Sequence, residues 1–221
     1  MKKIVLLLLL LMLLFGCSTM MYNKTLMSVE EIRNIYSEAE LEAVLDFEVF
    51  KMAMTGFSKI SPEKDDLLVI IDFALPSTDQ RFYVIDLKNK TLLHYTYTSH
   101  GVNTGENMAV NFSNIEGSRQ SSLGFFKTAE TYEGKHGLSL RLDGLERRFN
   151  KRARKRYIVI HSADYVTEEF IEENGRLGRS WGCPALPPHI AHDIIELIKE
   201  GAVLFAYAED EDYLSKSKLI K

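Results

Sequence analysis

The chain has 221 residues, of which 46% are hydrophobic and 26% are charged, and its formal net charge is −4 at pH 7. A length and an apolar content of this kind suit one globular domain with a small appendage. The acidic balance argues against a nucleic-acid partner, and the chain shows no internal repeat or low-complexity tract.

The N-terminus has the pattern of a secretory signal. Two lysines precede an apolar run over residues 4–15, which is well short of the roughly 20 residues that a transmembrane helix needs. Gly16 and Cys17 complete a segment that resembles a bacterial lipobox, in which Cys17 becomes a diacylated N-terminus with stable membrane attachment. We expect residues 1–16 to be a lipoprotein signal peptide and the mature protein to be anchored in the cell envelope, on the periplasmic side. A simple signal peptide with a free thiol is the alternative.

The next segment, residues 17–66, is predicted to be a membrane-proximal linker and helical arm. Residues 28–56 carry apolar side chains at steps of three and four, which gives one packing face of a helix. Ser28 and Ser37 each have a glutamate three residues on, which is the spacing of a capping box. Gly56 is expected to end the helical pattern.

From residue 67 the chain consists of short runs rich in β-branched and aromatic residues, separated by turn residues, which is typical of β-strands. The predicted strands cover residues 67–73, 81–87, 92–98, about 124–128, 157–161 and 203–207. The first three are expected to be antiparallel, and a helix over residues 189–200 follows two prolines. The predicted fold class is therefore mainly β with helices, like a β-sandwich, over residues 67–208, with a flexible tail over residues 209–221.

The turn-rich segment over residues 176–188, RLGRSWGCPALPP, contains Cys183 directly after a glycine. His161 lies upstream, at the end of an apolar run. A thiol and an imidazole on separate short elements are the two parts of a cysteine nucleophile and its base. If Cys17 is alkylated it cannot form a disulfide, so Cys183 is a lone thiol in an exported protein.

Several groups could complete such a site. The hydroxyl of Ser162, the carboxylate of Asp164 or a backbone carbonyl could orient the ring of His161, and the sequence leaves these three open. The amides of Gly182 and Cys183 could donate hydrogen bonds to a developing oxyanion.

Two motifs carry a resemblance to a known family, HSADY at residues 161–165 and SWGC at residues 180–183. Together they resemble the bacterial L,D-transpeptidase catalytic domain, also called the YkuD-like domain. The whole stretch from SHGVNTG through SLRLDGLE to GRSWGCPALPP looks most like its murein L,D-transpeptidase branch. The resemblance covers about residues 67–207. It implies the fold of that family, a β-sandwich-like domain that needs no cofactor or metal.

The resemblance also implies roles for single residues. Cys183 would be the acyl-accepting nucleophile and His161 its base, with Ser162 as the partner of His161. Ser180 and Gly182 would shape the loop at the substrate site. The implied substrates are peptidoglycan stem peptides, whose thioester with the enzyme is passed to an amine, as in cross-linking, or to water, as in an L,D-carboxypeptidase.

The chain departs from the family at positions that contact the substrate, since Trp181 stands where histidine or arginine is usual. With Ser180 it is a candidate substrate contact, and its ring could stack on a substrate or close the core beside Cys183. Arg176, Arg179 or His100 could instead bind a carboxylate of the stem peptide, because a guanidinium can form two parallel hydrogen bonds with it. His100 and His136, each followed by glycine in a loop, are both candidates for the wall of the cleft.

Other interpretations of these residues stay open. His189 and His192 could form a zinc site with Cys183 and His161, although a metal would consume the nucleophile. The basic run over residues 147–156 is either a solvated surface or a patch attracted to anionic envelope polymers or lipid headgroups. As whole-protein alternatives we consider a non-catalytic peptidoglycan-binding lipoprotein and a papain-like peptidoglycan amidase, in which the cysteine usually precedes the histidine.

Overall fold

A computed structural model describes residues 27–60 and 62–221 of the protein. The predicted signal peptide and the predicted lipidation of Cys17 fall outside these residues. Among the residues that are described, no helix is both long enough and apolar enough to cross a bilayer.

Between residues 27 and 60, the predicted arm contains three short helices rather than one, which are α2 (Val29–Glu38), η1 (Leu41–Ala43) and α3 (Phe47–Lys59). Ser28 caps α2 in a reciprocal capping box with Glu31, as predicted. The second predicted box is wrong. Ser37 lies inside α2, and α3 is instead capped by Asp46, whose carboxylate accepts hydrogen bonds from two amides of the first turn.

Gly56 does not end α3, contrary to the prediction. The helix continues to Lys59, and Gly56 is the point at which it meets the ring of Phe125. A Cβ atom at Gly56 would lie 2.0 Å from Cζ of Phe125. The Phe125 ring stacks on Phe205 with 4.4 Å between the ring centroids, so it has no room to withdraw. Close packing against the sheet, rather than helix termination, therefore requires the glycine.

Eight strands form one sheet in the order β3-β2-β1-β8-β4-β5-β6-β7. Their bounds are β1 (Leu67–Asp72), β2 (Phe82–Asp86), β3 (Thr91–Thr96), β4 (Gly124–Gly134), β5 (Gly137–Gly144), β6 (Val159–Ser162), β7 (Ala185–Leu186) and β8 (Val203–Tyr207). The first three strands are antiparallel, as predicted, whereas β5 and β7 escaped prediction. The strand β8 joins the two halves of the sheet, because it pairs with β1 on one side and with β4 on the other.

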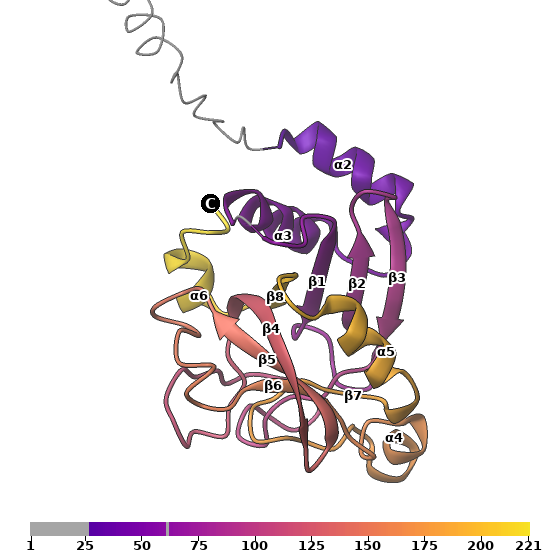
Figure 1. Cartoon of the computed structure of the whole chain (residues 1–221), viewed down its shortest axis with the longest axis vertical. Helices are drawn as coiled ribbons and strands as arrows, with labels where there is room; N and C mark the ends of the chain where they lie inside the picture. The colour runs from indigo at the N-terminus through magenta and orange to yellow at the C-terminus, as the bar shows by residue number, and fades with distance from the viewer. Residues whose placement is uncertain (1–26, 61) are drawn as a thin grey trace, which may run out of the picture.

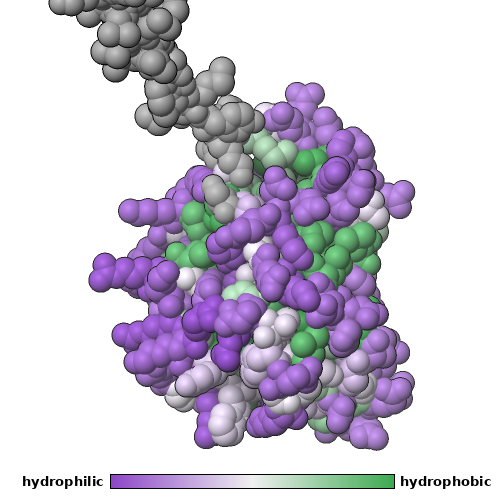
Figure 2. Space-filling view, in the orientation of Figure 1, coloured by the Kyte–Doolittle hydropathy of each residue, from purple (hydrophilic) through white to green (hydrophobic). Residues whose placement is uncertain are grey.

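Strand direction changes across the sheet, so that β1 to β3 run along the long axis of the molecule and β6 and β7 lie across it (Figure 1). The helix α3 packs against β1 and β8, and α5 (Pro188–Ile198) packs against β5 and β6. Every residue of β1 and of β8 is buried. Polar side chains cover most of the face seen in Figure 2, and apolar side chains show only in separate small areas. The fold is thus mainly β with helices and an N-terminal helical arm, which confirms the predicted fold class.

The C-terminal segment over residues 209–221 was predicted to be a flexible tail, but it is folded onto the domain. It contains α6 (Glu211–Lys216), from which Tyr213 is fully buried. The buried carboxylate of Glu146 accepts hydrogen bonds from the hydroxyl of Tyr213 at 3.0 Å and from that of Ser217 at 2.5 Å. It also accepts one from the amide of Phe125 at 2.9 Å. Because a buried carboxylate needs such donors, these bonds fix the segment to the sheet.

The substitution Gly56→Ala tests this packing. Alanine favours a helix by up to about 1 kcal/mol, but overpacking against the Phe125 ring is expected to reduce the free energy of unfolding by about 1–3 kcal/mol. Urea unfolding followed by circular dichroism measures the difference. The control is Lys51→Ala in the same helix, whose surface ion pair with Glu48 contributes little. Equal stability of Gly56→Ala and the parent would contradict the packing argument.

Candidate active site

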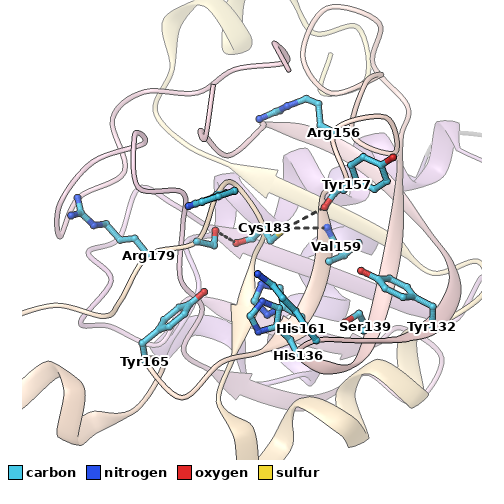
Figure 3. Close-up of a pocket in the computed structure, with 14 residues that line it drawn as sticks. Tyr132, His136, Ser139, Arg156, Tyr157, Val159, His161, Tyr165, Arg179 and Cys183 are labelled. Atoms are coloured by element: carbon cyan, nitrogen blue, oxygen red, sulfur yellow. Dashed lines mark hydrogen bonds between the residues drawn. The ribbon is translucent and has the colours of Figure 1, made fainter. Parts of the chain in front are cut away.

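The parallel pairing of β6 with β7 brings the two predicted catalytic side chains together. His161 lies opposite Ala185 in this pairing, so Cys183 precedes the partner of His161 by two residues. Side chains alternate along a strand, and Val159 and His161 therefore share one face. The amide of Val159 donates to Sγ of Cys183 at 3.4 Å. His161 and Cys183 line one cavity of about 550 Å³ (Figure 3).

The thiol of Cys183 is half-buried and is held by backbone groups. Its S–H donates to the carbonyl of Tyr157 at 3.4 Å, and the sulfur accepts from the amide of Val159 on the same backbone segment (Figure 3). Burial raises the pKa of the Cys183 thiol, and the N–H of Val159 and the charge of Arg156 oppose this increase. The thiol rather than the thiolate is therefore the main form at neutral pH.

The ring of His161 is oriented by a backbone carbonyl. Its Nδ1 lies 2.8 Å from the carbonyl oxygen of Ser162, whereas the side chain of Asp164 is exposed. Because a carbonyl can only accept, Nδ1 carries the hydrogen in the neutral ring and Nε2 is left as a proton acceptor. Of the three orienting groups that the sequence left open, the structure thus selects the backbone carbonyl.

The electrostatic surroundings keep His161 neutral. Burial lowers the pKa of His161, the hydrogen bond to Ser162 opposes this, and the charges of His136 and Lys135 lower the pKa further. His136 also stacks on His161, with 4.5 Å between the ring centroids and 26° between the planes. At neutral pH the imidazole and the thiol are therefore both uncharged.

The loop before Cys183 is fixed by internal hydrogen bonds. The hydroxyl of Ser180 donates to the carbonyl of Cys183 at 2.6 Å and accepts from the amide of Gly182 at 3.0 Å. Gly182 has φ +119°, and a Cβ atom there would lie 2.6 Å from the carbonyl oxygen of Gln120. Only glycine fits this position. The Gly182 amide, which we predicted to face an oxyanion, is bonded to Ser180 instead.

Three of the predicted substrate contacts line the cavity, namely Arg179, Ser180 and Trp181. The guanidinium of Arg179 bonds to the carboxylate of Glu106 at 2.6 Å. Trp181 is 70% exposed, and the guanidinium of Arg119 lies 4.4 Å from its ring centroid. A large exposed aromatic ring therefore stands at the mouth of the cavity, next to the loop that carries the thiol.

Two other predicted contacts, His100 and Arg176, lie outside the cavity wall. His100 is only 1% exposed, and its Nδ1 accepts from the buried guanidinium of Arg81 at 2.8 Å. Burial, together with the charge of Arg81, lowers the pKa of His100 to about 4. Arg176 bonds to Glu106 at 3.0 Å. His100 is therefore held by burial and by Arg81, and Arg176 is held by its ion pair with Glu106. Neither residue lines the cavity.

Several residues of the cavity wall were not predicted. The β4–β5 hairpin covers one side, because Ser139 pairs with His161 and the turn before it reaches over the imidazole. The wall residues that sequence reasoning missed or left undecided are Tyr132, Lys135, His136, Ser139, Arg156, Tyr157 and Tyr165. His136 was one of two candidate cleft histidines, and Arg156 was hidden within a basic run; the tyrosines carry no signal in the sequence.

The zinc alternative finds no support in the placement of its ligands. His189 lines a different pocket, beside Pro187, and His192 is exposed next to Asp193. In residues 27–60 and 62–221, no group of three or more potential ligands is arranged to hold a metal ion.

Comparisons with known proteins give one family match and several similar solved structures. A sequence profile described as the L,D-transpeptidase catalytic domain matches residues 41–207. A solved L,D-transpeptidase from Mycobacterium smegmatis is 14% identical, with 65% of this chain and 59% of that chain covered and a TM-score of 0.40. One from Stackebrandtia nassauensis is also 14% identical, with 81% and 77% covered and a TM-score of 0.39. A search of curated proteins gives no match.

The chain spans 59% of the length of the Mycobacterium smegmatis protein. The profile, in contrast, covers well over half of this chain. It begins at residue 41, inside the segment predicted to be a separate arm, and it ends with β8. On the basis of this match, the chain belongs to the L,D-transpeptidase catalytic domain family.

Proposed function

We propose that the protein is a cysteine-dependent L,D-transpeptidase that acts on peptidoglycan stem peptides, with Cys183 as nucleophile and His161 as base. The observation that carries the proposal is the shared cavity, in which a half-buried thiol and an imidazole with an available Nε2 both line the wall. Membership of the L,D-transpeptidase family supports the reaction and the substrate class.

In the first half of the proposed reaction, Sγ of Cys183 attacks the carbonyl carbon of the peptide bond that follows diaminopimelate. The thiol proton passes to Nε2 of His161 as the S–C bond forms, because neither group is charged at rest. The C–N bond then breaks, the imidazolium returns the proton to the departing amine, and D-alanine leaves. The product on the enzyme is a thioester.

In the second half an amine of another stem peptide, or water, attacks the thioester. Neutral His161 accepts a proton from that nucleophile, and the thiol of Cys183 is regenerated. Cross-linking and L,D-carboxypeptidase activity therefore share the acyl-enzyme and differ in the acceptor. Arg179 and Trp181, at the cavity wall, are the proposed contacts for the peptide, with Arg179 suited to one of its carboxylates.

The proposed location follows from the lipobox-like segment. A lipid on Cys17 would hold the domain at a membrane of the cell envelope, on the side where peptidoglycan lies. Radiolabelled palmitate incorporated into the protein in cells, and lost in Cys17→Ser, tests the anchor separately from the chemistry.

A first prediction concerns acylation of Cys183. In a Cys17→Ser background Cys183 is the sole cysteine of the chain. A carbapenem should add once to this protein, as seen by intact mass, and not to its Cys183→Ala variant. Isolated cell-wall sacculi should gain cross-links or lose D-alanine only with the protein that retains Cys183. An adduct with unchanged muropeptides would instead favour the non-catalytic peptidoglycan-binding alternative.

A second prediction concerns the base. The substitution His161→Ala should slow carbapenem acylation by at least about 100-fold, the usual contribution of general-base catalysis, and should leave the circular dichroism spectrum unchanged. His189→Ala is the matched control, since His189 is exposed in another pocket and its loss should not alter the rate. A His161→Ala variant that reacts as fast as the parent would remove His161 from its role.

A third prediction concerns pH. The base must be neutral to accept a proton, so acylation rises with pH through the pKa of His161. Because burial lowers this pKa, the half-maximal rate should fall below 6.5, the ordinary value for histidine. Carbapenem acylation rates measured from about pH 4 to pH 8 report the midpoint. A midpoint at or above 6.5 would contradict the environment described for His161.

A further inference from the structure

The basic run over residues 147–156 does not behave as one surface. Arg148 pairs with Asp212 and Arg154 pairs with Asp143, both at the surface. Arg156 is different, because it is half-buried and lines the same cavity as Cys183. It therefore needs an explanation that a solvated patch does not provide.

Within the part of the chain that the structure describes, the guanidinium of Arg156 is bonded only to neutral oxygen atoms. It donates to the carbonyl oxygens of Ser113 at 2.5 Å and Gln120 at 2.6 Å. It also donates to the hydroxyls of Ser122 at 2.6 Å and Ser118 at 3.0 Å. No carboxylate contributes to these bonds, so the positive charge is held in place without being neutralised by a direct partner.

These bonds fix a segment that touches the loop of the thiol. The carbonyl oxygen of Gln120, which accepts from Arg156, lies so close to Gly182 that a Cβ atom at Gly182 would be only 2.6 Å from it. The neighbouring hydroxyl of Ser121 donates to the carbonyl of Gly182 at 3.2 Å. Through this segment Arg156 supports the residue directly before Cys183.

The other side of Arg156 leads to the sulfur through the backbone. Tyr157 follows it, with φ +56°, a left-handed conformation that is strained for a bulky residue. Its carbonyl accepts the S–H of Cys183, and Val159, two residues on, donates its amide to the same sulfur. The four hydrogen bonds of Arg156 thus anchor the strained turn from which both backbone partners of Sγ arise.

The charges around the cavity are consistent with an effect of Arg156 on the sulfur. No aspartate or glutamate is among the described residues that line it. The carboxylate of Glu116, which acts on Arg156, pairs with Lys155. The other charged or titratable wall groups are Lys135, His136, His161 and Arg179, with three tyrosines. Of all these charged groups, only Arg156 lowers the pKa of Cys183 through its charge. Burial has the larger effect, and it raises this pKa.

We propose that Arg156 is a positioning residue for Cys183, which holds the turn around the sulfur and supplies the positive charge that favours its thiolate. This inference rests on the proposed function, in which Cys183 is the nucleophile. It assigns to Arg156 the electrostatic part that is usually attributed to an adjacent imidazolium, and it leaves to His161 the proton transfers of the reaction.

The test compares two substitutions in the full chain with a Cys17→Ser background. Alkylation by iodoacetamide is measured as a function of pH, because the rate follows the thiolate fraction of Cys183. Arg156→Gln removes the charge and should raise the midpoint by about one pH unit, with about tenfold slower alkylation at pH 7. Arg156→Lys keeps the charge, so its midpoint should stay close to that of the parent, although its melting temperature should fall because the forked bonds are lost.

A second pair of variants keeps Arg156 itself, so the charge can still be tested if the Arg156 variants do not fold. Ser118→Asp places a carboxylate beside the guanidinium and should raise the midpoint, whereas the neutral Ser118→Asn should not. Arg154→Gln, in the same basic run but at the surface, is the control and should leave the midpoint unchanged.

An unchanged midpoint in both Arg156→Gln and Ser118→Asp would overturn the proposal. Equal increases in Arg156→Lys and Arg156→Gln would overturn it as well, because they would show that the hydrogen bonds and not the charge matter. Iodoacetamide reports on the thiol without peptidoglycan, so these outcomes are independent of the muropeptide assay. If the parent protein shows no activity on cell-wall sacculi although its Cys183 titrates as expected, the proposed function would be contradicted instead.

Discussion

The cavity that holds Cys183 and His161 depends on the parallel pairing of β6 with β7. The strand β7 has only two residues. This short contact is reinforced from the other side, where the carbonyl of Ala185 accepts hydrogen bonds from the amide of Ser99 at 3.0 Å and from the hydroxyl of Thr98 at 3.1 Å. The register of the pairing decides that Cys183 lies level with Val159 and next to His161. A shift by one residue would turn the thiol to the opposite face of the sheet.

The cavity combines burial with fixed dipoles. Burial acts against charge on both Cys183 and His161, since it raises the pKa of the thiol and lowers that of the imidazole. The groups that act in the other direction are rigid, and they include the amide of Val159 and the carbonyl of Ser162. In the proposed reaction, burial keeps both groups uncharged at rest. The preorganised dipoles would stabilise the charge that develops as the thiol proton moves.

The sequence predicted the features that depend on local pattern, such as the apolar strands β1 and β8 and the capping box at Ser28. Motif spacing indicated that Cys183 and His161 belong to one site, and both line the same cavity. What escaped prediction depends on contacts between distant residues. Gly56 looks like a helix terminus until Phe125 is placed beside it, and the C-terminal tail looks frayed until Glu146 is seen to bind Tyr213. Arg156 has no local signature because it stands in a run of other basic residues in the sequence. The strand β7 has none because it is only two residues long.

The position of β8 has a consequence for the order in which the molecule is built. It is the last strand in the sequence and yet lies in the middle of the sheet, between β1 and β4. Until residues 203–207 are available, the strands on either side of it can form only two unconnected half-sheets. Closing contacts over such long sequence separations is slow. A nascent chain therefore cannot complete its core before β8 has been made, however early the other strands emerge.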